Sequence, residues 1–118
     1  MSMDPGQTPH GRVAATFALA LVAGDFDQAH GMLTSTAKRR WELATLRTTF
    51  LEMVEYFETP PNHVEVMETM TEWPAREPSD VGWAYAAISS ESESEAVTVV
   101  VSSEGGRHLI RSIEWYRP

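Results

Sequence analysis

The sequence predicts an α+β fold, with three N-terminal helices packed on a four-stranded, mostly antiparallel sheet. Two observations carry this prediction. In the first half of the chain the apolar residues recur at helical spacing, and after Pro61 the repeat changes to the two-residue period of strands. Because helices and strands are segregated along the chain, the expected architecture is helices covering one face of an antiparallel sheet.

Length and composition bound the organisation of the chain. Residues 1–8 combine Pro, Gly and small polar residues and are predicted to be a flexible N-terminus, followed by a single domain over residues 9–118. The net charge of −8 argues against broad contact with nucleic acid or an anionic membrane, because both need a basic surface. Cysteine is absent, which suits a reducing, cytoplasmic location, and no apolar run is long enough for a membrane span.

The first helix is predicted over residues 9–23. Its apolar residues are so numerous that the helix is expected to be covered on more than one side. The apolar stripe of the helix is formed by Val13, Phe17, Ala20 and Leu21. Leu19 and Val22 widen this stripe.

The stretch LALVAGDFDQAHGML predicts a corner between two helices. Gly24 suits the left-handed conformation that ends a helix. Asp25 suits the N-cap of the next helix, with Gln28 three residues further on, as in a capping box. A second, short helix is therefore expected to start at once in a new direction.

A third helix is predicted over residues 41–57, and the two prolines of TPPN end it. The segment before it, TSTAKRR, holds several potential N-caps. Short connections, including SESESE (90–95) and EGGR (104–107), then separate four predicted strands: 63–73, 81–89, 96–103 and 108–116. The alternation of the first strand is imperfect at Met67–Glu68.

The third strand has no polar face, because Val97, Val99 and Val101 alternate with Thr98 and Val100. A strand that is apolar on both faces needs cover on both sides. The helices supply one side, and a second copy of the chain is the natural cover for the other. A homodimer through the outer sheet face is therefore predicted.

With these elements the chain resembles the nuclear transport factor 2-like superfamily, the cystatin-like α+β fold that includes ketosteroid isomerase and polyketide-cyclase-like proteins. The likeness is carried by FALALVAGDFDQAHGML (17–33), which is similar to the helix–corner–helix opening of many bacterial members, and it spans roughly residues 10–117. It implies a cone-like shape with a curved sheet, a pocket enclosed by sheet and helices, and frequent dimerisation through the outer sheet face.

The resemblance also implies a catalytic pattern, in which isomerase-type members use a carboxylate base and a tyrosine or acid that donates a hydrogen bond. The four aspartates fall outside the predicted strands, where the carboxylates are Glu65, Glu68, Glu72 and Glu114, and this departs from the family pattern. The candidates that remain for acid–base chemistry are Glu114, His30 and His108, with Tyr85 or Tyr56 as the donor. His30 lies on the apolar face of the second helix, where a core histidine bonded to its neighbours is the alternative.

A ligand pocket is predicted between sheet and helices. Aromatic walls with a few polar groups suit a small organic ligand. The residues expected to line the pocket are Tyr56, Trp83, Tyr85, His108 and Trp115, together with Glu114. The alternative is that these aromatic side chains belong to the core or to a dimer interface.

No cofactor or metal is predicted. The histidines, His10, His30, His63 and His108, lack paired ligand spacing. Gly105-Gly106 is a turn rather than a phosphate loop, because no Lys-Ser/Thr pair follows it.

Three functional hypotheses remain. The first is a dimeric module without assigned catalysis that binds a small apolar molecule or a basic protein partner. The second is a proton-transfer enzyme of the isomerase, dehydratase or cyclase type, which would use the Glu or His base and Tyr donor named above. The third is a toxin-neutralising, immunity-type protein, for which the acidic net charge is the argument.

Overall fold

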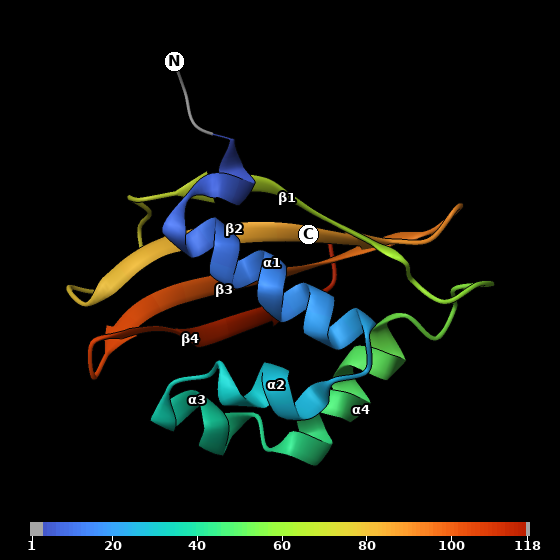
Figure 1. Cartoon of the computed structure of the whole chain (residues 1–118), viewed down its shortest axis with the longest axis horizontal. Coiled ribbons are helices and arrows are strands. Elements are labelled where there is room, and N and C mark those ends of the chain that lie inside the picture. Colours follow the sequence, from blue (N-terminus) through green and yellow to red (C-terminus); the bar gives the residue numbers. More distant parts are fainter. Residues whose placement is uncertain (1–3, 118) are drawn as a thin grey trace.

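The computed structural model describes residues 4–117 and confirms the α+β class, with four antiparallel strands in one open sheet (Figure 1). The strands follow the chain in the order β1-β2-β3-β4, each antiparallel to the next. The helices are η1 (Pro5–Gln7, a 3-10 helix), α1 (Pro9–Val22), α2 (Phe26–Gly31), α3 (Ser35–Arg40) and α4 (Leu43–Met53). The strands are β1 (His63–Met70), β2 (Asp80–Ser89), β3 (Ser94–Glu104) and β4 (Arg107–Trp115).

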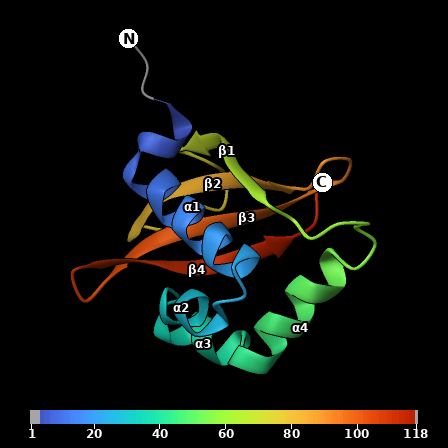
Figure 2. The ribbon, with the colours of Figure 1, turned by 45° about the vertical axis from the view of Figure 1, so that its right-hand side comes forward.

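The helices cover one face of the sheet, which we call the helix side. Helix α1 runs across the strands, while α2, α3 and α4 gather beyond it along the β4 edge (Figures 1 and 2). Among residues 4–117 no helix covers the opposite face, which we call the outer face. None of the described helices has the length and apolarity that crossing a membrane requires.

The core lies between α1 and the sheet. Alternate residues of β2 and β3 point into it, and they are small or aliphatic: Ala84, Ala86, Ile88, Val97, Val99 and Val101. Facing them are Phe17 and Leu21 of α1, and Leu46 and Met53 of α4 complete the cluster. All these side chains are almost wholly buried.

The corner between α1 and α2 forms as predicted. Gly24 has φ +76°, and the Asp25 side chain accepts a hydrogen bond from the Gln28 backbone N–H at 3.2 Å. Helix α1 is covered on more than one side, by the sheet and by α2, as predicted, but Leu19 is 54% exposed. The chain of helices α2–α4 lies on the β4 side of α1, so one strip of α1 stays open to solvent.

The third helix predicted over residues 41–57 corresponds to α4, which ends earlier, at Met53, and the short helix α3 before it was not predicted. Thr34 caps α3 by accepting from the Ala37 N–H at 3.2 Å. Trp41, with φ −120° and ψ 76°, then breaks the helix before α4 begins. The cause lies in β4: the Thr34 N–H donates to the Ile110 carbonyl at 2.8 Å, so the chain is fixed to the sheet where α3 starts.

The strands agree with the predicted segments apart from their ends. The imperfect alternation at Met67 corresponds to a β-bulge, where the register with β2 shifts between Val66 and Glu68. β1 ends at Met70, and β3 starts within SESESE at Ser94. Of the predicted N-terminal flexible segment, Pro5–Gln7 forms η1 beside β1, and residues 1–3 lie outside the described residues.

Candidate functional site

The alternation of β2 decides where the predicted pocket residues lie. Ala84 and Ala86 face α1, so Trp83 and Tyr85 stand on the outer face, where both are half-buried. The expectation that these two aromatic residues line a pocket between sheet and helices is therefore wrong. The physical reason is space, because α1 lies so close to β2 that alanines fill the helix side.

Residues of all four strands form a row across the outer face. Glu68 pairs with Tyr85, Tyr85 with Thr98, and Thr98 with Glu114. The bulge at Met67 brings Glu68 into this row. Cross-strand partners on one face have side chains close enough to interact. The row therefore places one carboxylate at each edge of the sheet, with the side chains of Tyr85 and Thr98 between them.

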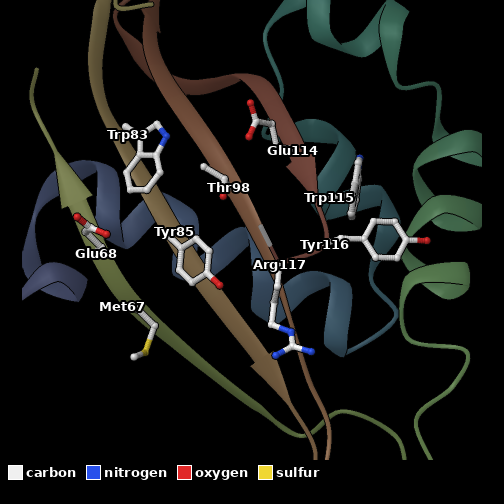
Figure 3. Close-up of a pocket in the computed structure, with 9 residues that line it drawn as sticks. All are labelled: Met67, Glu68, Trp83, Tyr85, Thr98, Glu114, Trp115, Tyr116 and Arg117. Atoms are coloured by element: carbon white, nitrogen blue, oxygen red, sulfur yellow. The ribbon is translucent and has the colours of Figure 1, made fainter. Parts of the chain in front are cut away.

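A hollow of about 450 Å³ opens over this row (Figure 3). Its walls come from the strands and from the C-terminal tail. The strand residues are Met67, Glu68, Trp83, Tyr85, Thr98, Glu114 and Trp115, and the tail adds Tyr116 and Arg117. Four aromatic side chains with a few polar groups around a concavity of this size are the features of a small-molecule site.

The outer face of β3 is covered within a single chain. Thr98 and Val100 are each 8% exposed, although no helix lies above them. Their cross-strand partners on β2 are Tyr85 and Trp83, and those rings supply the cover. The apolar character of β3 is thus satisfied without a second copy, and the homodimer stays a prediction.

Trp115 borders both faces. It lines one end of the hollow, and its ring also packs edge-on against Trp41, with the ring centroids 5.7 Å apart. Its indole Nε1 is buried and has no hydrogen-bond partner among the described residues. Trp115 therefore belongs partly to the core and partly to the hollow.

The structure does not bring Tyr56 or the two candidate histidines into this hollow. The Tyr56 hydroxyl donates to Glu95 Oε2 at 2.9 Å, and its pKa is raised by burial and by that hydrogen bond. His30 is half-buried on α2, and His108 is exposed at the start of β4. Tyr56, His30 and His108 therefore do not share the hollow with Tyr85.

His10 occupies an environment that the sequence did not reveal. It is 4% exposed, and both ring nitrogens are buried without a hydrogen-bond partner among residues 4–117. The ring lies against Gly82, where an added Cβ would come within 2.3 Å of it. Burial lowers the pKa of His10, and the positive charge of nearby His108 lowers it further.

A second cluster fixes the start of β2. Asp80 opens that strand and accepts from Arg111 Nε at 2.6 Å and Arg111 Nη2 at 2.7 Å, and from the Ser102 hydroxyl at 2.6 Å. The Arg111 hydrogen bonds hold the pKa of Asp80 well below its ordinary value, against the opposing effect of burial. With its oxygens paired inside the chain, this cluster is built to hold strands together. The aspartate at the start of β2 and Arg111 in the middle of β4 are the sequence signals for it.

Within residues 4–117, no three histidine, aspartate or glutamate side chains gather into a group that could hold a metal ion. Glu114 and Glu68 are exposed and form no salt bridge with any described residue. The chemistry available in the hollow is thus aromatic contact, hydrogen bonding by the Tyr85 and Tyr116 hydroxyls, and two uncompensated negative charges.

Comparison with protein-family models, with curated proteins and with solved structures found no match to this chain.

Proposed function

We propose that this chain is a small-molecule binding module whose site is the hollow on the outer face of the sheet. The single observation that carries the proposal is the placement of Trp83 and Tyr85, two large aromatic residues that face away from the core and line a concavity. Aromatic side chains left on a surface hollow are an unused source of apolar binding energy. The ligand has an apolar part that rests on these rings.

The resemblance to the nuclear transport factor 2-like superfamily remains part of this proposal. The helix–corner–helix opening at Gly24 and the antiparallel sheet that follows support it. The cone-like curvature and the homodimer of that family are proposed on the same ground, and a cytoplasmic location is proposed from the absence of cysteine. A second copy and a basic protein partner compete with the small molecule for the outer face.

A thermal-shift screen of small aromatic compounds tests the binding function, because a ligand that binds the folded state raises its melting temperature. Compounds that stabilise the wild type are then tested on Trp83→Ala and on Leu43→Ala. Leu43 is exposed on α4, away from the hollow, and serves as the matched control. We expect the stabilisation to persist in Leu43→Ala and to be lost in Trp83→Ala. Equal stabilisation of both variants would contradict the proposed site.

The second candidate function is proton transfer, and one observation favours it. Tyr85 and Glu114 line the same hollow in one cross-strand row, separated by Thr98, so a carbonyl compound bound between them would meet a donor and a carboxylate base. The test is the exchange of a carbonyl compound's α-hydrogen with deuterium from D₂O. Catalysed exchange that Glu114→Gln abolishes would support the enzyme, and a rate equal to that without protein would exclude it.

A further inference from the structure

The carboxylates of the hollow have no salt-bridge partner among residues 4–117. They belong to Glu68 and Glu114, and both residues are exposed. Arg117 also lines the hollow, but its Nε lies 3.8 Å from Glu95 Oε1, and its backbone N–H donates to the same oxygen at 3.0 Å. Glu95 therefore offsets the positive charge of Arg117, and the hollow keeps two unbalanced negative charges.

The Trp83 ring lies diagonally across Thr98 from one of these charges, because Trp83 pairs with Val100 and Glu114 pairs with Thr98. Figure 3 shows Trp83 and Glu114 on either side of Thr98, standing on the same face of the sheet. They come from β2 and β4, which are separated by β3, so their backbones lie two strand spacings apart, about 10 Å. Both side chains line the hollow together with Thr98, so one alkylated ammonium group bound there can meet the ring and the carboxylate.

Resting on the proposed function, we infer that the ligand of the hollow is an organic cation. Its ammonium group sits over Thr98, with the Trp83 ring on one side and the Glu114 carboxylate on the other. Its apolar body extends over Tyr85. The ring attracts the cation through its quadrupole, and the carboxylate attracts it through charge. An uncharged ligand of the same shape would partly desolvate Glu114 and provide no compensating charge.

The acidic balance of the chain supports the same ligand class. A net charge of −8 raises the local concentration of cations at the surface and repels anions. The electrostatic field of this net charge acts on every approaching cation. The Trp83 ring and the Glu114 carboxylate beside Thr98 select a cation that also carries an apolar body.

Two compounds of nearly equal shape provide the test: 3-hydroxyphenyltrimethylammonium, which is charged, and 3-tert-butylphenol, which is not. Binding is followed by NMR on the full chain, through the Trp83 indole and Thr98 methyl resonances. We expect the charged compound to bind about tenfold more tightly or better. We expect Glu114→Gln to reduce this ratio severalfold and higher salt to reduce it in the wild type.

Glu52→Gln is the control variant, because it removes the same charge from the exposed surface of α4, away from the hollow. It should leave the ratio unchanged. Equal binding of the two compounds, with the same resonances shifted, would overturn the cation inference and leave the proposed binding function standing. An equal fall of the ratio in Glu52→Gln and Glu114→Gln would also overturn the inference, because net charge alone would then explain the preference. If neither compound shifts the Trp83 and Thr98 resonances, the cation inference is wrong, and the thermal-shift screen decides the proposed binding function separately.

Discussion

The two faces of the sheet are built from the same strands but carry side chains of very different size. On the helix side, β2 contributes Ala84 and Ala86, which are fully buried against α1. On the outer face, the alternating residues of the same strand are Trp83 and Tyr85, which line an open hollow. The comparison teaches that side-chain size alone does not identify the core. In this chain the small residues permit close packing, and the large ones form a surface that is suited to binding.

The close approach of α1 explains the small residues. Gly82 continues the alanine series, and His10 lies so near that any side chain there would collide with its ring. A larger residue at position 84 or 86 would push α1 away from the sheet. The outer face has no such neighbour, so it accommodates two aromatic side chains.

Phe17→Ala should have the largest effect, because it removes a fully buried ring from the helix side. We expect the free energy of unfolding to fall by about 3–5 kcal/mol, measured by urea denaturation. Tyr85→Ala, on the outer face, should cost only about 1 kcal/mol, because Tyr85 is half-buried. Similar losses of stability in the two variants would contradict the division of the sheet into a stabilising helix side and a binding outer face.

Asp80→Asn tests the polar cluster of Asp80, Arg111 and Ser102, which we expect to be as important for stability as the apolar core. Removing the charge leaves Arg111 with a weakened partner at a site where the Asp80 side chain is fully buried. We expect a loss of about 3 kcal/mol in urea denaturation. Glu77→Gln, which removes the exposed partner of Arg111 at 3.4 Å, should change stability by less than about 1 kcal/mol. A loss of that small size for Asp80→Asn as well would contradict a structural role for the cluster.

The depressed pKa of Asp80 also predicts acid sensitivity. A carboxyl group whose pKa is lowered by folding stabilises the protein above its ordinary pKa of 3.8, and this stabilisation is lost as the pH falls towards the lower folded value. The free energy of unfolding should therefore decline below about pH 4, and more steeply in the wild type than in Asp80→Asn. Parallel acid limbs for the two proteins would refute this assignment.

His10 predicts a smaller pH effect on the helix side. Its folded pKa is depressed, so the unfolded chain binds the proton more readily once the pH falls below the ordinary histidine value of 6.5. Stability should decline from about pH 7 to pH 5 in the wild type, and less so in His10→Gln. His63→Gln, which changes an exposed histidine on β1, should keep the wild-type slope. If His63→Gln loses the slope instead, the pH dependence of stability belongs to His63 and not to His10.

Leu19→Gln should have the smallest effect. Leu19 is two residues from Phe17 on α1 but is 54% exposed, so we expect a change within about 0.5 kcal/mol. A loss close to that of Phe17→Ala would mean that the strip of α1 around Leu19 is covered in solution.

Local signals explain what the sequence predicted well. The corner at Gly24 and Asp25 depends on backbone conformation and capping, and both act within a few residues. The bulge at Met67 was visible as a fault in the alternation. The break at Trp41 was not visible, because it depends on the attachment of Thr34 to β4, far away in the sequence.

The candidate site could be predicted only in part. Trp83, Tyr85 and Glu114 were identified as pocket residues, but β2 has apolar residues in both alternations, so the sequence could not assign the face. The pairing of Asp80 with Arg111, 31 residues apart, depends on strand register and on the irregularity near Val101. Register also decides that Glu68 joins the row of Glu114.

Thr98 and Val99 are neighbours in β3 that face opposite sides of the sheet, and they provide the most direct test of a binding site on the outer face. The measurement is the intermolecular nuclear Overhauser effect between the protons of bound 3-hydroxyphenyltrimethylammonium and the methyl groups of these two residues. The structure predicts strong effects to the Thr98 methyl and none to the Val99 methyls. Effects to Val99 without Thr98 would place the ligand between sheet and helices and contradict the account.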